Sequence, residues 1–148
     1  MKIVVTGGAG FIGSHLVDKL ISLGHQVTII DNLITGSKGN INKKAEFYDL
    51  DIKDEKIGKV FSEFKPEAVF HLAGQTSVKA SLMNPSFDAD ENIYGTLNIL
   101  EVAKKYNIEK FIFASTAAIY GDVKNLPVEE EENAQPISFY GLSKSFAE

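Results

Sequence analysis

The feature that most constrains the fold is the first 24 residues, where a glycine-rich turn separates a short apolar run from a helical pattern. The run from Lys2 to Thr6 is β-branched and almost wholly apolar, which is typical of a strand buried on both faces. After the turn, apolar residues recur at three- and four-residue steps until Gly24 supplies a stop. We expect the apolar stripe of this helix to comprise Phe11, Ile12, Leu16, Val17, Leu20 and Leu23.

The glycines of the turn stand three residues apart, at Gly7, Gly10 and Gly13. Gly7 would permit the tight turn, Gly10 the approach of a pyrophosphate, and Gly13 close packing of the helix on the strand. The free amides of Phe11 and Ile12, at the positive end of the helix dipole, would receive the phosphates. A GxxGxxG spacing alone also fits an ordinary glycine-rich turn. Between a buried strand and an amphipathic helix, it predicts the start of a Rossmann dinucleotide-binding unit.

A second strand, Gln26 to Ile30, leads into Asp31, which lies 18 residues after Gly13. This is close to the roughly 20-residue spacing at which a Rossmann acid reaches the adenosine ribose hydroxyls. A carboxylate there would repel a 2′-phosphate, so the sequence favours NAD over NADP; the alternative is a simple turn aspartate. The glycine-rich, polar segment 32–42 is expected to form a loop around the adenosine.

The remaining pattern alternates strands and helices. We expect strands at 45–50, 68–72 and 110–114, and helices at 54–64, 85–106 and from 138 onward. Asp54 is the expected N-cap of the first of these helices. The order predicts an α/β fold, a doubly wound parallel sheet of strand order 3-2-1-4-5.

The core stripe expected for the helix at 85–106 comprises Phe87, Ile93, Leu97, Leu100 and Ala103, with Ile99 and Tyr106 flanking it. Asn92 falls near this stripe, where a polar side chain needs a partner. The last helical pattern is still running at Glu148, and a full doubly wound domain would add at least a sixth strand. We therefore expect residues 1–148 to be the NAD-binding Rossmann domain of a longer protein, with a carboxyl-terminal substrate domain outside this chain.

The composition of the chain argues against several classes of function. A net charge of −5 and the lack of a clustered basic face argue against nucleic acid. No apolar run approaches the roughly 18 residues of a membrane span. The absence of cysteine fits a reducing cytoplasm, and His15, His25 and His71 lack the clustered partners of a metal site, so we expect a cytoplasmic protein without a metal. The acidic run from Glu129 to Glu132 is expected to be a solvated loop.

Tyr140 and Lys144 stand four residues apart and would share one face of a helix. A tyrosine is a poor base at neutral pH because its phenol has a pKa of about 10, but a nearby ammonium stabilises the phenolate. Tyr140 could then exchange a proton with a substrate hydroxyl, which Thr116 or Ser115 would hold. An amphipathic surface pair is the alternative. With the dinucleotide unit upstream, the pattern predicts oxidation of a carbinol by hydride transfer to a nicotinamide.

Taken together, the chain resembles the extended short-chain dehydrogenase/reductase family, and within it the nucleotide-sugar 4-epimerases of the UDP-glucose 4-epimerase type. The resemblance covers essentially the whole chain. The motifs that carry it are TGGAGFIG at Thr6 to Gly13, DNL at Asp31 to Leu33, DI at Asp51 and Ile52, HLAGQ at His71 to Gln75, NIYGTLNILE at Asn92 to Glu101, STAAIYG at Ser115 to Gly121 and YGLSK at Tyr140 to Lys144.

The resemblance implies a site for each part of the cofactor NAD. Tyr140 would be the acid–base, Lys144 would bind the nicotinamide ribose and tune Tyr140, and Thr116 would bond the 4-hydroxyl of a UDP-sugar. The residues implied to contact NAD are Gly7, Gly10, Phe11, Ile12 and Gly13 at the pyrophosphate, Asp31 and Asn32 at the ribose, Asp51 and Ile52 at the adenine, and Leu72, Ala73, Gly74, Asn92, Tyr140 and Lys144 toward the nicotinamide.

Comparison within the family separates related activities. The 4,6-dehydratases place Asp-Glu directly after the active-site threonine, whereas this chain has Ala117 and Ala118. The related UDP-glucuronate decarboxylases also tend to have an acid at the second position after the threonine, so Ala118 argues against that activity too, but more weakly. A nucleotide-sugar decarboxylase or reductase and a catalytically silent NAD-binding fragment remain alternatives. The resemblance also implies a homodimer through helices 86–106 and 138–148.

Overall fold

The computed structural model describes residues 1–124 and 126–148. The chain divides into two compact units. The first comprises Met1–Ala73 and Asn98–Ala114, and the second comprises Gly74–Leu97 and Ser115–Glu148.

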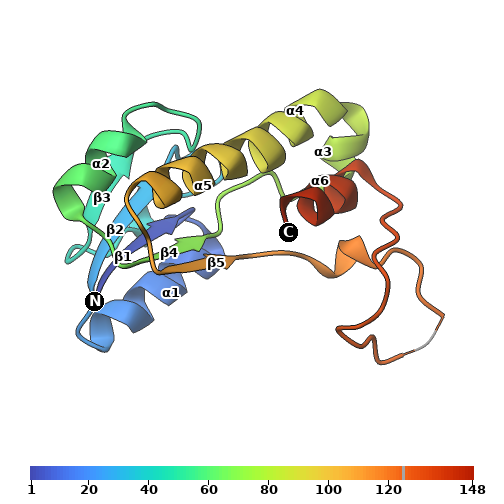
Figure 1. The fold of residues 1–148 in the computed structure, drawn as a ribbon, viewed down its shortest axis with the longest axis horizontal. Coiled ribbons are helices and arrows are strands. Elements are labelled where there is room, and N and C mark those ends of the chain that lie inside the picture. The colour runs from blue at the N-terminus through green and yellow to red at the C-terminus, as the bar shows by residue number, and fades with distance from the viewer. Residues whose placement is uncertain (125) are drawn as a thin grey trace. The chain divides into compact units, whose positions relative to one another are not determined.

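The first unit contains a five-stranded parallel sheet of order β3-β2-β1-β4-β5, which confirms the predicted topology (Figure 1). The central strand β1 places Val4 opposite Thr28 on β2 and Val69 on β4. The strands are β1 (Lys2–Thr6), β2 (Gln26–Asp31), β3 (Glu46–Asp49), β4 (Ala68–His71) and β5 (Lys110–Phe113).

Helices cover both faces of this sheet, as the near-continuous apolar strands require (Figure 1). On one face, α1 (Phe11–Ser22) buries Val17 and Leu20 against the sheet. On the other, α2 (Ile57–Phe64) and the carboxyl-terminal part of α5 (Gly95–Lys105) bury Phe61 and Ile99. Among the described residues the two cores share no member, because alternate side chains of each strand point to opposite faces.

The predicted apolar stripe of α1 is wrong in part. Phe11 and Ile12 are 80% and 69% exposed, and Leu23 is exposed as well. Gly13 faces the backbone of the glycine-rich turn at close range, and Val17 and Leu20, one and two turns later, share its face. Phe11 and Ile12, in the first turn, point away from that face.

Helix α2 begins later than expected, and its cap is not Asp54. The helix starts at Ile57, and Lys56 occupies the N-cap position without a side-chain hydrogen bond. Asp54 instead accepts a 2.8 Å hydrogen bond from the backbone N–H of Lys56, two residues on. This local turn competes with helix formation and delays it.

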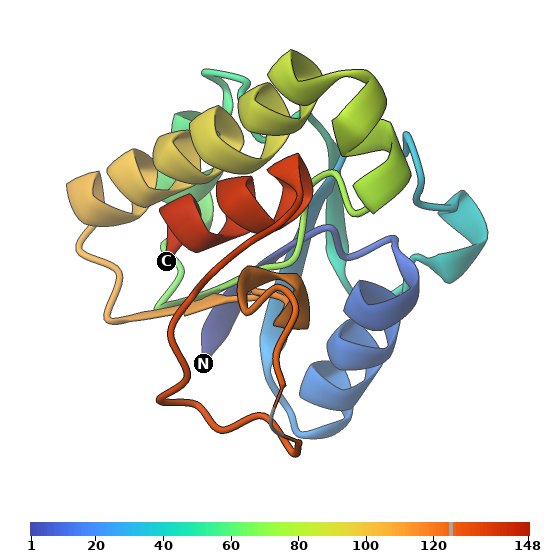
Figure 2. The same ribbon diagram turned by 90° about the vertical axis from the view of Figure 1, so that its right-hand side faces the viewer.

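The second unit is helical. Its last helix, α6 (Phe139–Ala147), packs against α3 (Val78–Met83), α4 (Pro85–Ala89) and a π-helical turn, η2 (Asp90–Tyr94) (Figure 2). Helix α3 was not predicted from the sequence. A short 3₁₀ turn, η3 (Ala117–Ile119), also packs on α6, and a similar turn, η1 (Lys38–Asn40), lies in the first unit.

The π turn explains why the stripe predicted for the long helix is partly wrong. After this turn, Leu97 and Leu100 are exposed, whereas Ile99 and Ala103 are buried. Phe87 is exposed as well, but it lies before the turn, on α4. A π turn holds more residues than an α turn, so it rotates every later position relative to the ideal helix. A prediction that assumed uninterrupted α geometry therefore misplaced Leu97 and Leu100, whereas Ala103 is buried as predicted.

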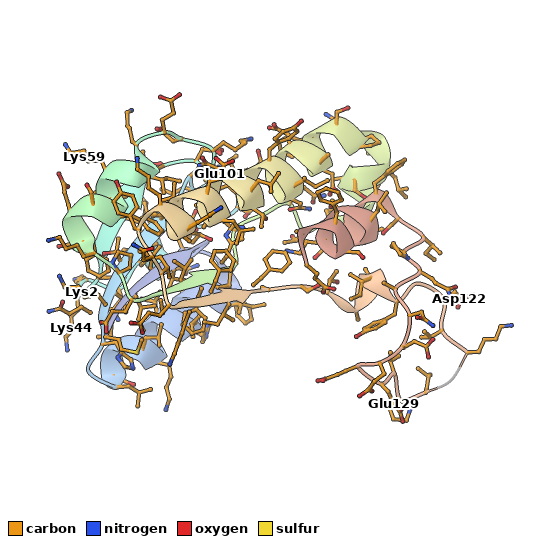
Figure 3. The ribbon with its side chains drawn as sticks, viewed as in Figure 1. Lys2, Lys44, Lys59, Glu101, Asp122 and Glu129 are labelled. Carbon is orange, nitrogen blue, oxygen red and sulfur yellow. The ribbon has the colours of Figure 1, made fainter. Side chains whose placement is uncertain are left out.

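The acidic segment of the second unit behaves as predicted. Glu129 to Glu132 are exposed, and Asp122 and Glu129 are labelled on this long loop in Figure 3. In the described part of the chain, no helix has the length and apolarity that crossing a membrane requires.

Candidate functional site

The glycine-rich turn after β1 has the backbone geometry that its sequence suggested. Gly7 has a φ of 71°, and a Cβ added to it would lie 2.7 Å from the Ala73 nitrogen. A Cβ on Gly13 would lie 2.1 Å from the Gly7 carbonyl oxygen, so the close approach of α1 to the turn requires glycine there. Gly10 is the N-cap of α1 and provides no side-chain cap, which leaves the first-turn amides available to an anion.

Asp31, at the end of β2, is tied to this turn. Its Oδ2 accepts a 2.9 Å hydrogen bond from the Ala9 backbone N–H, and its Oδ1 accepts a 2.8 Å bond from the Leu33 N–H. The side chain is buried, with 7% exposure. Each carboxylate oxygen can accept a further hydrogen bond, which is what a pair of ribose hydroxyls would need.

The loop after Asp31 closes over the glycine-rich turn. The Ala9 carbonyl accepts hydrogen bonds from the Ser37 backbone at 3.0 Å and from the Asn40 side chain at 2.9 Å. Asn32 donates a 2.9 Å bond to Asp51 Oδ2, so the structure brings these two predicted site residues together. The predicted loop at 32–42 is therefore held against the glycine-rich turn by hydrogen bonds.

Thr6 and His71 organise the end of β4, a role that the sequence analysis missed. Their side chains are fully buried, and Thr6 Oγ1 lies 2.6 Å from His71 Nδ1. The Leu72 backbone donates to the Thr6 carbonyl at 3.1 Å, and the Ala73 N–H donates to Thr6 Oγ1 at 3.2 Å. These bonds set the path of Leu72 and Ala73 beside the glycine-rich turn.

In the second unit, Asn92 has the partners that its burial demanded. Its Oδ1 accepts a 2.9 Å bond from the Gln75 backbone, and its Nδ2 donates to the Gln75 carbonyl at 3.1 Å. A Cβ on Gly74 would lie 2.6 Å from Asn92 Oδ1. The structure thus brings the predicted site residues Gly74 and Asn92 together.

The helix α6 carries Tyr140 and Lys144 one turn apart, as predicted. Ser138 caps it by accepting a 3.0 Å bond from the Gly141 N–H, and the Tyr140 N–H donates to Ser81 Oγ at 3.1 Å. A Cβ on Gly141 would lie 2.5 Å from the Ala118 carbonyl oxygen, so glycine allows α6 to approach η3 closely.

Thr116 precedes η3 and caps it. Its Oγ1 accepts a 3.2 Å bond from the Ala118 N–H and remains free to donate its own proton. Because η3 packs on α6, the second unit brings the segments of Thr116 and Tyr140 together. Ser115, the alternative in the sequence analysis, is exposed.

Lys144 is buried, with 6% of its surface exposed. Burial lowers the pKa of its ammonium to about 8, and the negative charges of Asp88 and Glu148 oppose that shift. A lysine that changes charge near neutral pH is unusual and marks a candidate functional group.

The predicted site residues are distributed over both units. The first unit holds Gly7, Gly10, Phe11, Ile12, Gly13, Asp31, Asn32, Asp51, Ile52, Leu72 and Ala73. The second holds Gly74, Asn92, Thr116, Tyr140 and Lys144.

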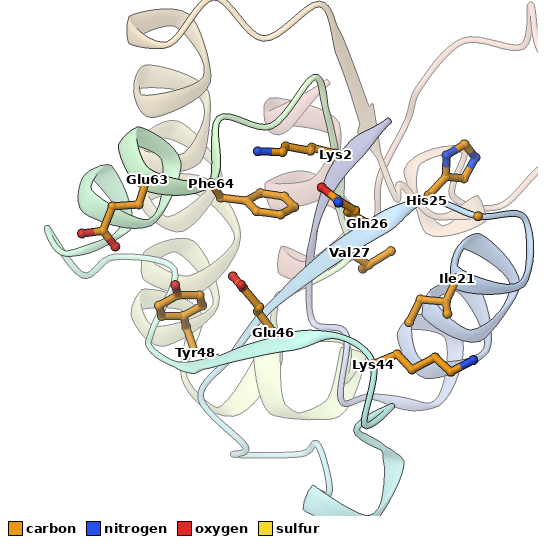
Figure 4. Close-up of a pocket in the computed structure, with 11 residues that line it drawn as sticks. Lys2, Ile21, His25, Gln26, Val27, Lys44, Glu46, Tyr48, Glu63 and Phe64 are labelled. Carbon is orange, nitrogen blue, oxygen red and sulfur yellow. The ribbon is translucent and has the colours of Figure 1, made fainter.

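A depression of about 650 Å³ lies by the amino ends of β1, β2 and β3, at the end of these strands opposite to the glycine-rich turn and Asp31 (Figure 4). Lys2, Tyr48 and Phe64 contribute to its lining, and the Lys2 ammonium lies 5.5 Å from the centre of the Phe64 ring. Burial and the charges of Glu46 and Glu63 raise the pKa of Tyr48. Asp31 and the glycine-rich turn follow carboxyl ends of strands, so this depression is separate from the candidate site.

Within residues 1–124 and 126–148, no three His, Cys, Asp or Glu side chains cluster as a metal site would need.

The fold and the turn after β1 define an α/β protein of the Rossmann class. The family model for the NAD dependent epimerase/dehydratase family matches residues 3–148, and the chain belongs to that family. This confirms the resemblance inferred from the sequence motifs.

Several relatives and solved structures that this chain is similar to are UDP-glucose 4-epimerases. The chain is 40% identical over 145 residues to UDP-glucose 4-epimerase of Lacticaseibacillus casei, a match that covers 97% of this chain and 44% of the relative. The structure of UDP-glucose 4-epimerase from Thermotoga maritima with UDP-glucose superposes with a TM-score of 0.96 at 51% identity, covering 99% of this chain and 48% of that one. The UDP-glucose 4-epimerase of Thermus thermophilus in complex with NAD gives a TM-score of 0.96 at 44% identity, with the same coverage of both chains. The chain therefore spans about half the length of the relatives it matches.

Proposed function

We propose that these residues form the NAD-binding Rossmann domain of a cytoplasmic nucleotide-sugar 4-epimerase that acts on UDP-glucose and UDP-galactose. The observation that carries the proposal is the buried Lys144, one helical turn from Tyr140 on α6. An ammonium in this position can stabilise a phenolate, which acid–base chemistry on a sugar hydroxyl needs. Membership of the epimerase/dehydratase family and the names of the relatives support the choice of reaction.

The residues of the first unit fit NAD. The first turn of α1 lacks a side-chain cap and an acidic residue. Gly7, in the turn before the helix, and Gly13, in its first turn, contribute no side chain. Phosphates would accept from the amides of Phe11 and Ile12. The buried Asp31 carboxylate would accept from the adenosine ribose and would repel the 2′-phosphate of NADP.

In the proposed reaction, NAD takes the hydride from C4 of the sugar and returns it to the opposite face. Tyr140 takes the proton of the 4-hydroxyl and later gives it back. Thr116 donates a hydrogen bond to the same oxygen, and the positive charge of Lys144 stabilises negative charge on the phenolic oxygen of Tyr140. Ala117 and Ala118, in η3, carry no acid that could eliminate water, which favours epimerisation over dehydration.

We also propose that the second unit mediates homodimerisation. On α6, Leu142 and Phe146 are 56% and 68% exposed and lie one turn apart. Phe87 on α4 and Tyr94 on η2 are exposed as well. Apolar side chains repeated at helical spacing on exposed helices are suited to pairing with a second copy.

Isothermal titration of the chain with NAD, and then with UDP-galactose in the presence of NAD, tests the proposed function. We expect NAD to bind. Binding of NAD without the sugar would place sugar recognition mainly outside these residues, whereas binding of both would mean that they also form a sugar site. A folded chain that binds no NAD would contradict the proposal.

A further inference from the structure

Asp88 is a fully buried carboxylate in the second unit, with 1% exposure. Its Oδ1 accepts hydrogen bonds from Gln75 Nε2 at 2.6 Å and from Asn92 Nδ2 at 3.3 Å. Its Oδ2 accepts a 2.5 Å bond from Ser143 Oγ. The donors come from the loop after β4, from η2 and from α6, so one carboxylate joins three segments. Burying a carboxylate is costly unless such bonds are made, and losing one would leave a buried group unsatisfied.

Ser143 is the contact that links Asp88 to α6. It is 3% exposed and directly precedes Lys144. Its hydroxyl donates to Asp88 and accepts a 3.1 Å bond from Asn92 Nδ2, so both its donor and its acceptor are engaged. A buried hydroxyl held from two sides fixes the rotation of the helix about its axis. That rotation determines where the side chains of Tyr140 and Lys144 point.

Ionisable groups occur on several elements around α6. Burial lowers the pKa of Lys144 to about 8, and Asp88 and Glu148 oppose this shift. A helix that rotated or loosened would rehydrate the ammonium and let its pKa return toward 10.5. The ionisable side chains on α6 and on the elements that pack against it are Lys79, Asp88, Asp90, Glu91, Tyr94, Tyr140, Lys144 and, after α6, Glu148.

We propose that Asp88 is a positioning residue, which acts through Ser143 to set the orientation of α6 and thereby of Tyr140 and Lys144. This inference rests on the proposed function, in which Lys144 binds the nicotinamide ribose. Asp88 itself touches neither cofactor nor sugar in this proposal. It affects Tyr140 and Lys144 only indirectly, through its hydrogen bonds with Ser143 and Asn92.

The test compares NAD with ADP, which lacks the nicotinamide ribose. Asp88→Asn removes the charge, and Ser143→Ala removes the bond to α6. The control is Asn84→Ala, which removes the N-cap of α4, a 3.1 Å bond to the Phe87 N–H, and leaves the Asp88 bonds intact. All binding is measured by titration calorimetry under conditions where circular dichroism shows each variant fully folded.

We expect both Asp88→Asn and Ser143→Ala to bind NAD about tenfold more weakly and to bind ADP as the wild type does. Asn84→Ala should bind both like the wild type. A merely structural role of Asp88 would leave the ratio of NAD to ADP affinity unchanged, and that result would overturn the proposal. If the ratio of NAD to ADP affinity fell in Asp88→Asn but not in Ser143→Ala, the proposal that Asp88 acts through Ser143 would be overturned.

A second readout separates this inference from the proposed function. If the wild type binds no NAD, the proposed function fails, and NMR titration of the Lys144 side chain then tests the positioning role. Ser143→Ala should raise the titration midpoint of Lys144 from about 8 toward 10.5, whereas Asn84→Ala should not change it. An unchanged midpoint in Ser143→Ala would overturn the positioning role. If Ser143→Ala fails to fold, Ser143→Cys replaces it, because a thiol has nearly the same size but is a weak donor. It should likewise raise the Lys144 midpoint, and an unchanged midpoint would overturn the positioning role.

Discussion

The Ala9 backbone N–H donates a 2.9 Å hydrogen bond to the carboxylate of Asp31, which ties the glycine-rich turn after β1 to the end of β2. Asp31 has two proposed tasks, because its oxygens would also accept from the ribose of NAD. Its removal should therefore affect both the turn and the choice of cofactor.

Asp31→Ala should bind NAD at least about tenfold more weakly, since a charge-assisted hydrogen bond contributes about 1.5–3 kcal/mol. The ratio of NAD to NADP affinity should also fall, because the 2′-phosphate no longer meets a carboxylate. Titration calorimetry with both dinucleotides measures this. Asp49→Ala, an exposed aspartate at the end of β3, is the matched control and should change neither affinity. An unaltered NAD to NADP ratio in Asp31→Ala would contradict the assigned role.

Gly13→Ala should destabilise the chain by about 1–3 kcal/mol, because the new Cβ would meet the Gly7 carbonyl oxygen at 2.1 Å and force α1 away from the turn. Urea unfolding followed by circular dichroism measures the free energy. Gly58→Ala, on α2 with no atom within 4 Å of the new Cβ, should instead stabilise the chain by up to about 1 kcal/mol. Equal stabilities for the Gly13 and Gly58 variants would refute the packing argument.

Lys144 should make the stability of the chain depend on pH. Its pKa is about 8 in the folded protein and 10.5 as the ordinary value, so between these limits the unfolded chain binds a proton that the folded chain does not. Stability attributable to this group therefore rises with pH across that window, by about 1 kcal/mol per pH unit, and is flat below pH 8. Lys144→Met should lack this rise, whereas Lys104→Met, on an exposed position of α5, should retain it. The same slope in all three proteins would argue against a buried ammonium.

Tyr140→Phe removes only the phenolic oxygen. We expect it to abolish any epimerisation of UDP-galactose by the chain, because no group is left to take the proton, while NAD affinity stays within about twofold. Tyr94→Phe, at a position that is 66% exposed on η2, should change neither property. The measurements are a coupled assay for UDP-glucose and calorimetry with NAD. Full turnover by Tyr140→Phe would rule out its acid–base role.

Leu142→Asp should shift the chain toward monomer, because it places a carboxylate in the exposed apolar row of α6 that we propose to pair with a second copy. Sedimentation velocity over a range of concentrations measures the association. Lys43→Asp, at an exposed position before β3, is the control and should leave the association unchanged. A wild-type chain that remains monomeric at high concentration would contradict the dimer proposal.

The sheet and the order of its elements were predictable because their determinants are local. The buried run from Lys2 to Thr6, the glycines after it and the strand ending before Asp31 constrain strand, turn and strand over short distances along the chain. Tyr140 and Lys144 were likewise recognisable, because a four-residue spacing on a helix is a property of the helix alone. The exposure of Phe11 and the π turn at Asp90–Tyr94 were not predictable from periodicity.

The hydrogen-bond network around Asp88 was not predictable from the sequence either. The sequence offered two signals for it: Asn92 falls near the apolar stripe, and Asp88 and Asn92 stand four residues apart, a spacing that also fits a solvated face. The bond between Asp88 and Ser143 joins residues 55 positions apart. By itself, the sequence determined the parallel sheet, the glycine-rich turn and the residue types available for chemistry. Only the tertiary structure decided which helix faces are buried and how α6 is held, because packing and buried hydrogen bonds depend on residues that are distant along the chain.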